Sequence, residues 1–154
     1  MKGHVRLGLY ALCALAIVGL LLLGTVVYRA TTLEAGVIAL KAQDYETSWK
    51  KLKPLAMVGD DDAQHLIGRM YAYGWGVEKD RNKALYWLRR AGKWTTSETD
   101  PAAAAAFYIA KEFAEGVGSI HKNPAEAREW FEIASSGGSQ AAAEELRRYR
   151  TEEL

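Results

Sequence analysis

Cysteine is almost absent from this sequence: the 154 residues contain one, Cys13, and it lies inside a long apolar run. Because no cysteine follows position 13, the rest of the chain forms no internal disulfide. His65 and His121 have no second histidine three or four positions away and no cysteine partners, so the pattern of a zinc site is missing as well. The sequence therefore predicts neither a metal site nor any other cofactor.

An excess of charge of one sign is also missing. The chain has 20 basic and 19 acidic residues, and 17 of the basic residues and all 19 acidic ones follow residue 30. A nucleic-acid-binding protein needs a concentrated basic surface, which this composition does not supply. Gly74-Trp75-Gly76 and Gly116-Val117-Gly118 lack the third glycine and the preceding strand of a phosphate-binding loop. We therefore predict no nucleic-acid or nucleotide ligand.

Motifs of catalysis are equally scarce. Ser48 and Lys51 have the Ser-x-x-Lys spacing of penicillin-interacting serine enzymes, but the companion Ser-Asp-Asn and Lys-Thr-Gly elements are absent. A serine three residues before a lysine is common by chance. The sequence predicts no catalytic residue and no small-molecule substrate. An enzyme is therefore a weaker hypothesis than the two binding functions described below.

One long apolar run is present, at residues 7–28, and it contains no charged side chain. At about 1.5 Å per residue its helix spans about 33 Å, enough for the hydrocarbon core of a bilayer. The alternative is a cleaved signal peptide, whose apolar region is usually shorter and ends at a small-x-small site. Here the nearby candidate ends at Ala30, with Tyr28 and Arg29 inside the recognition sequence. We predict a retained transmembrane anchor over residues 1–30.

The charges that flank this run predict its orientation. Lys2 and Arg6 precede it, and Arg29 follows it. The positive-inside rule then places the N-terminus in the cytoplasm and the rest of the chain across the inner (cytoplasmic) membrane, in the periplasm or another extracytoplasmic space.

The remainder of the chain repeats itself. The segment 63–91 returns at 105–134, so that Gly74 corresponds to Gly116 at an offset of 42 and Trp87 to Trp130 at an offset of 43. Self-similarity at a fixed period indicates stacked structural repeats, in which each unit buries its apolar face on its neighbours.

Capping signals divide this region into short helices. Asp60, Asp80, Asp100 and Asn123 each stand where an N-cap is expected, and proline follows the last two. We predict helices at about 33–43, 45–57, 61–73, 80–91, 100–115, 124–136 and 140–149, with Pro54 kinking the second of these.

The residues Ala-Gln-x-x-Ile-Gly-x-Met-Tyr-x-x-Gly-x-Gly-Val, followed by Lys-Ala-x-x-Trp-x-x-x-Ala-Gly, closely resemble the Sel-one-like repeat, a tetratricopeptide-like helix-turn-helix unit. The resemblance implies an all-α fold in which the transmembrane helix precedes a right-handed α-solenoid of antiparallel helix pairs. Its domain of residues 31–154 would hold a degenerate repeat, two full repeats and a capping helix, at 33–58, 60–92, 100–136 and 139–150.

The resemblance also implies where a partner binds, because the first helix of each pair lines the concave face in such stacks. With Leu66, Ile67, Met70 and Tyr71 assigned to the core, the other positions of 61–73 and their equivalents 42 residues later are predicted to face the groove. The predicted protein-binding residues are Gln64, His65, Arg69, Tyr73, Phe107, Lys111 and Glu115. An alternative is that Phe107 packs under the loop 93–99, against Trp94.

Two functional hypotheses follow. The first is a membrane-tethered adaptor or scaffold that binds a protein on the concave face of its repeats. The second is a small accessory or assembly subunit that docks into a larger membrane complex through its transmembrane helix.

Overall fold

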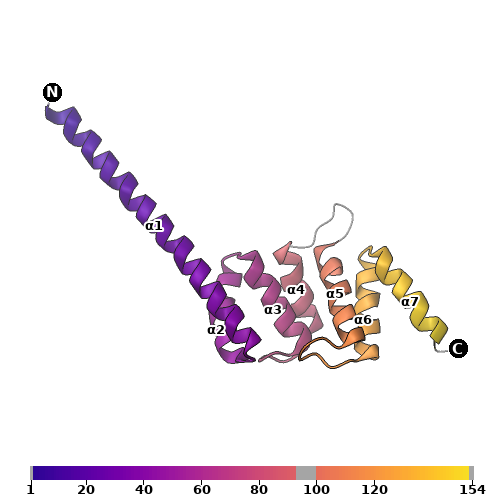
Figure 1. The fold of residues 1–154 in the computed structure, drawn as a ribbon. Helices are drawn as coiled ribbons and strands as arrows, with labels where there is room; N and C mark the ends of the chain where they lie inside the picture. The colour runs from indigo at the N-terminus through magenta and orange to yellow at the C-terminus, as the bar shows by residue number, and fades with distance from the viewer. Residues whose placement is uncertain (1, 93–99, 153–154) are drawn as a thin grey trace.

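In a computed structural model that describes residues 2–92 and 100–152, the chain forms seven helices and no strand (Figure 1). The helices are α1 (Lys2–Lys41), α2 (Tyr45–Met57), α3 (Asp61–Tyr73), α4 (Arg81–Ala91), α5 (Pro101–Glu115), α6 (Pro124–Ser136) and α7 (Gln140–Glu152). The predicted all-α fold is confirmed.

The predicted capping residues begin the helices. The side chains of Asp60, Asp80 and Asn123 each accept a hydrogen bond from the backbone N–H three residues later, and Asp100 accepts one from Ala102. Asp44 caps α2 in the same way, through the N–H of Thr47. These caps satisfy backbone donors that have no partner within the helix, so the sequence sets where each helix starts.

Successive helices pack as antiparallel pairs, and the pairs stack into a solenoid (Figure 1). We call α1, α3 and α5 the A helices and α2, α4 and α6 the B helices. Turns of one edge, which we call the A-to-B edge, lie at 42–44, 74–80 and 116–123. At the opposite edge, the B-to-A edge, α2, α4 and α6 end and α3, α5 and α7 begin.

Two apolar clusters form the core of the solenoid. Trp87 is 9% exposed and lies in the cluster between α2, α3 and α4, while Trp130 is fully buried in the cluster of α5 and α6. The two tryptophans that correspond in the repeats are therefore both core residues, as the repeat register predicts. Gly74 and Gly116 both end their helices with a positive φ, which glycine adopts without steric cost.

The first helix differs from its predicted form. We expected a helix at 33–43 separate from the apolar run, but α1 is one helix of 40 residues that contains both. Nothing between residues 28 and 33 breaks a helix, since neither glycine nor proline occurs there. The division into domains at residue 30 stays a prediction, because a single helix crosses it.

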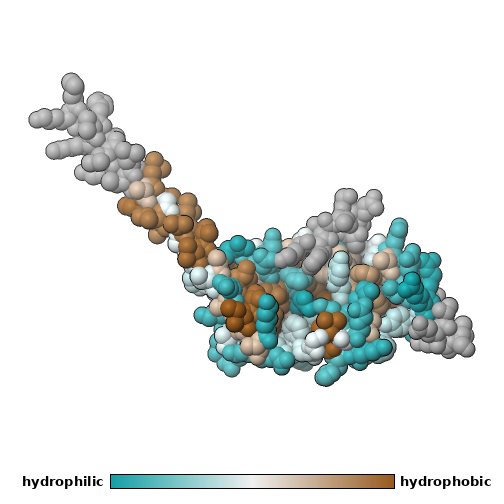
Figure 2. All heavy atoms as spheres, in the orientation of Figure 1, coloured by the Kyte–Doolittle hydropathy of each residue, from teal (hydrophilic) through white to brown (hydrophobic). Residues whose placement is uncertain are grey.

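The C-terminal part of α1 packs on α2 as the first A helix. Ala39 is buried, Leu33 and Leu40 pack against the cluster of α2 and α3, and a Cβ on Gly36 would lie 2.6 Å from Leu52 Cδ2. From residue 14 to residue 31, in contrast, every side chain of α1 is exposed. The exposed apolar part of the helix therefore projects from the repeats as a rod (Figures 1 and 2).

Candidate functional site: a groove along the A helices

A groove lies along the A helices, and we call it the A-helix groove. Its larger part encloses about 550 Å³ between the end of α1, α3 and the loop after α5. Its smaller part encloses about 160 Å³ between α3 and α5. Arg69 and Glu112 line both parts. The two hollows are therefore one surface feature, crossed in the middle by this pair of residues.

Arg69 and Glu112 form an ion pair across the groove. Arg69 Nη2 donates to both carboxylate oxygens of Glu112, at 2.7 and 2.9 Å. The hydroxyl of Tyr73 also donates to Glu112. Both charged side chains are about three-quarters buried, with 27% of Arg69 and 24% of Glu112 exposed. The charge of Arg69 is thus matched within the chain and is shielded from water on most sides.

The walls of the larger part are mostly apolar. Val37 and Leu40 come from α1, Leu66 from α3 and Ile120 from the loop after α5. Trp75 joins them; its ring is stacked on Tyr45, with centroids 5.9 Å apart. Arg69 lies over the Trp75 ring at 5.7 Å, a distance within the range of a cation–π contact. Lys41, Gln43 and Ser119 also line this part. The groove thus combines mostly apolar walls with the charged crossing and one further cation, Lys41.

His65 lines the smaller part of the groove, together with Tyr108 of α5. Burial lowers the pKa of His65 from its ordinary 6.5 to about 4, and the nearby positive charge of Arg69 contributes. The imidazole is therefore neutral in the folded protein at physiological pH.

One expectation about α3 is wrong and another holds only in part. Gln64 was predicted to face the groove, but it is 2% exposed, and its Nε2 donates to the carbonyl of Ala56 in α2. The cause is that α3 packs between α2 and α4, so both flanks of the helix are buried. Leu66 was predicted to be core; it packs against the core cluster but is half-buried and also lines the groove.

The predicted residues of α5 are placed less favourably for binding. Phe107 is half-buried and packs against Phe131 of α6, with ring centroids 5.8 Å apart. Its alternative neighbour, Trp94, lies outside the described residues. Lys111 pairs with Glu115 on its own helix at 3.2 Å. None of these three residues lines either part of the groove. Their role in binding stays a prediction, as it does for His65, Arg69 and Tyr73.

Sequence reasoning missed Glu112 and Tyr108, and the reason is geometrical. An offset of 42 identifies equivalent positions of α3 and α5, such as Arg69 and Lys111. Neighbouring A helices face each other through their flanks, however, and Arg69 meets Glu112, one position further on. The sequence does contain a signal for this contact: Arg69 and Glu112 carry opposite charges and lie 43 residues apart.

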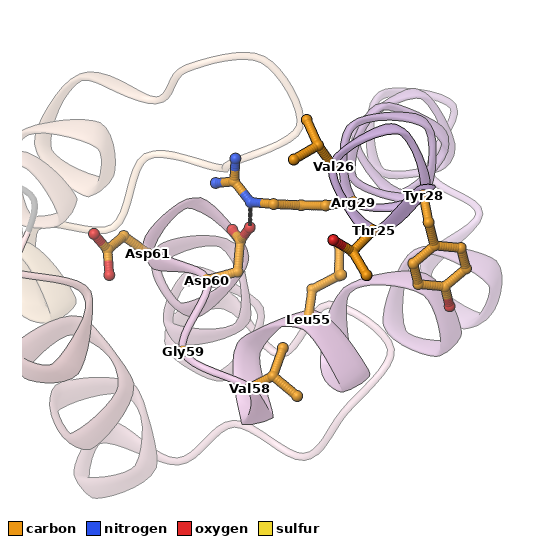
Figure 3. Close-up of a pocket in the computed structure, with 9 residues that line it drawn as sticks. All are labelled: Thr25, Val26, Tyr28, Arg29, Leu55, Val58, Gly59, Asp60 and Asp61. Atoms are coloured by element: carbon orange, nitrogen blue, oxygen red, sulfur yellow. Dashed lines mark hydrogen bonds and ion pairs between the residues drawn. The ribbon is translucent and has the colours of Figure 1, made fainter. Parts of the chain in front are cut away.

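A second pocket lies where α1 leaves the solenoid (Figure 3). It encloses about 440 Å³ between the last turn of the apolar run of α1 and the α2–α3 turn. Arg29 of α1 reaches across to Asp60, the N-cap of α3, and forms an ion pair with it. The Asp60 side chain is 3% exposed, and its other oxygen accepts from the N–H of Ala63. Arg29 thus fastens α1 to the start of α3.

Among the described residues, α1 is the one helix whose length and composition suit a membrane crossing, within Ala14–Lys41. A signal sequence near an N-terminus satisfies the same criteria. In the same part of the chain, no group of three or more His, Cys, Asp or Glu side chains is placed to hold a metal ion.

Comparison with known proteins identifies the repeats. The family model described as Sel1 repeat matches residues 61–93 and 103–139, the segments that contain α3–α4 and α5–α6. A similar solved structure is that of a Sel1 repeat protein from Oxalobacter formigenes, 28% identical, with a TM-score of 0.41. The match covers 74% of this chain and 44% of that one, so the chain spans less than half the length of that protein. No curated protein matches. Sel1 repeats are in general protein-interaction modules, and this chain contains two Sel1-like repeats, which form the successive helix pairs α3–α4 and α5–α6.

Proposed function

We propose that this protein is a membrane-tethered adaptor that binds a protein segment in the A-helix groove. The observation that carries the proposal is that the anchor and the groove share one helix. Val37, Leu40 and Lys41 of α1 line the groove, and the exposed apolar part of the same helix lies N-terminal to them. From Arg29 to Val37 the helix rises about 12 Å. A membrane-embedded α1 would therefore hold the groove at a short, fixed distance from the bilayer.

The apolar part of α1 has the features of a membrane segment. Leu15, Leu20 and Val26 are between 63% and 70% exposed, and nothing in the described chain covers them. In water such a continuous apolar surface is unfavourable, whereas in lipid it is matched to its solvent. The flanking charges favour a cytoplasmic N-terminus, in which case the repeats lie in the periplasm or an equivalent space.

The groove favours a partner segment with apolar side chains. Its walls offer Leu66, Trp75 and Ile120, while the charge of Arg69 is already matched by Glu112. An apolar side chain placed there gains burial without breaking that ion pair. Arg69 therefore does not require an acidic partner.

A matched pair of tyrosines tests the groove. Tyr108 lines its smaller part and is 54% exposed; Tyr86 on the B helix α4 is 53% exposed and lies outside the groove. Partner capture from solubilised membranes is measured for the full chain carrying Tyr108→Glu or Tyr86→Glu, with circular dichroism to verify folding. We expect loss of capture for Tyr108→Glu alone. Equal capture by both variants would rule out the groove as the binding surface.

To distinguish the accessory-subunit alternative from the adaptor, the anchor sequence is changed while the Arg29–Asp60 ion pair is kept. Replacing residues 7–24 with an unrelated apolar sequence preserves Thr25 to Arg29 and hence the ion pair with Asp60. An adaptor keeps its partner after this exchange. A subunit that docks through its transmembrane helix loses it.

A further inference from the structure

The topology of the solenoid decides which edge faces the membrane. α1 is the first A helix, so its N-terminal part leaves the stack at the B-to-A edge, where α2 also ends (Figure 1). If the apolar part of α1 is embedded, as the proposed function requires, the B-to-A edge points toward the bilayer. The A-to-B edge, with its glycine turns at 74–80 and 116–123, points away from it.

The α2–α3 turn lies at the level of the C-terminal end of the apolar run, the end nearest the repeats. Val58 lines the pocket in Figure 3 together with Thr25, Val26 and Tyr28 of α1. Tyr28 is the last residue of the uncharged run, and Thr25 lies about 4.5 Å before it along the helix axis. The turn therefore stands beside the last turn of the segment that would lie in the bilayer.

The side chains of this turn are apolar and exposed. Val58 is 83% exposed and Met57 66% exposed, in a position where the helix end needs no apolar residue. Tyr28, 62% exposed, lies at the same level on α1 and is of the residue type enriched at membrane–water interfaces. Val58 and Tyr28 line the same pocket, so the apolar surface of the turn continues that of the anchor, and Met57 adjoins Val58 in sequence.

We infer that the α2–α3 turn, through Met57 and Val58, is a second membrane contact that rests in the bilayer interface beside α1. The occupant of this surface is lipid, because the surface continues the apolar face of the candidate membrane helix. Asp61 and Asp62 follow immediately, and Arg29 is paired with Asp60, so the turn offers no cationic surface to anionic headgroups. The contact is therefore apolar, and it rests on the proposed membrane anchoring. Together with the Arg29–Asp60 pair it sets the tilt of the solenoid relative to the membrane.

The experiment uses the full chain in nanodiscs, with Cys13→Ser as the background and one new cysteine carrying an environment-sensitive fluorophore. The test position is Val58→Cys. Glu78→Cys, exposed in a turn of the A-to-B edge, is the matched negative control, and Leu20→Cys inside the apolar run is the positive control. Nanodiscs of phosphatidylcholine contain a nitroxide quencher near the headgroup for Val58 and Glu78 and one on the acyl chains for Leu20, with or without added phosphatidylglycerol.

We expect the Val58 label to show a blue-shifted emission and strong quenching, the Glu78 label to show neither, and phosphatidylglycerol to add nothing. Quenching of Leu20 with none at Val58 would overturn this inference and leave the anchor intact. Absence of quenching at Leu20 would contradict the anchor itself. A blue-shifted emission of the Val58 label in native membranes but not in nanodiscs would also overturn the inference. The surface at Val58 would then be covered by a protein and not by lipid. The same measurement at Met57→Cys guards against a local effect of the first substitution.

Discussion

At the scale of single residues, the packing of the stack depends on glycine, which has no side chain, as well as on the large apolar residues. A Cβ added to Gly68 would lie 2.8 Å from Leu88 Cγ and 3.2 Å from the carbonyl oxygen of Ala84, so α3 and α4 approach each other at this glycine. Leu88 is 1% exposed and has little room to move. In the next repeat, the equivalent position carries Ala110, which is fully buried. The two repeats thus differ in the side chain at this helix–helix contact.

Gly68→Ala should destabilise the protein in spite of the higher helix propensity of alanine. Overpacking of a core costs about 1–3 kcal/mol, which exceeds the gain of about 1 kcal/mol from replacing glycine in a helix. Urea unfolding followed by circular dichroism measures the difference. The exchange Gly68→Ala with Ala110→Gly keeps the composition and should be less stable than either single variant. If Gly68→Ala is as stable as wild type or more stable, the Leu88 side chain can move aside without cost.

His65 should make the stability of the fold depend on pH. Its folded pKa is lowered to about 4 while the unfolded value stays near 6.5, so the unfolded chain binds the proton first as the pH falls. The stability from this group is present above pH 6.5, declines between pH 6.5 and 4, and is lost below. Melting temperatures of His65→Gln and wild type should therefore converge or cross on acidification. His121→Gln, at an exposed position, is the control, and parallel curves for wild type and His65→Gln would contradict the shift.

At the scale of helices, ion pairs connect neighbouring elements of the stack. Arg69 and Glu112 join α3 to α5, whereas Lys79 of the α3–α4 loop and Glu126 join that loop to α6. Arg29 and Asp60 join α1 to α3. These pairs connect helices that are not consecutive in the chain. They therefore connect the repeats beyond the contacts that consecutive helices make.

A double-mutant cycle measures the strength of the connection between α3 and α5. Arg69→Ala, Glu112→Ala and the double variant should give a coupling energy above the about 0.2–1 kcal/mol of exposed pairs, since both side chains are mostly buried. The matched control is Glu46 and Lys50, which pair at 2.6 Å on the surface of α2 with 78% and 69% of their side chains exposed. Equal coupling energies in the two cycles would mean that water screens the groove pair as fully as the surface pair.

At the scale of the whole molecule, α1 determines how the repeats are presented. A single helix runs from the apolar segment into the wall of the groove, and Arg29 fastens it to the cap of α3. Since no loop separates the apolar segment from the repeats, the proposed anchoring would keep the groove from rotating freely with respect to the bilayer. A fixed orientation suits an adaptor that must meet a partner at a defined height above a membrane.

We expect the chain to keep its first 30 residues. Cleavage after Ala30 would remove Arg29 and leave the Asp60 carboxylate, 3% exposed, without its guanidinium partner. N-terminal sequencing of the protein from membranes should therefore show no start near Thr31, and a C-terminal reporter should be active only outside the cytoplasm. A chain that begins at Thr25 should melt at a higher temperature than one that begins at Thr31. Equal melting temperatures, or the opposite order, would show that the ion pair does not stabilise the fold.

The sequence by itself determined the local structure of this protein. Capping residues such as Asp80 and Asn123, the helix-ending glycines and the recurrence of Trp87 as Trp130 depend on interactions within a few residues or on the repeat itself, and they predict most helix limits. Tertiary structure decided which side chains are accessible. Gln64 is buried because α2 packs on it, and Arg69 is neutralised because α5 places Glu112 opposite. Such contacts join residues far apart in the chain, and the periodicity of a single helix contains no information about its neighbours' flanks.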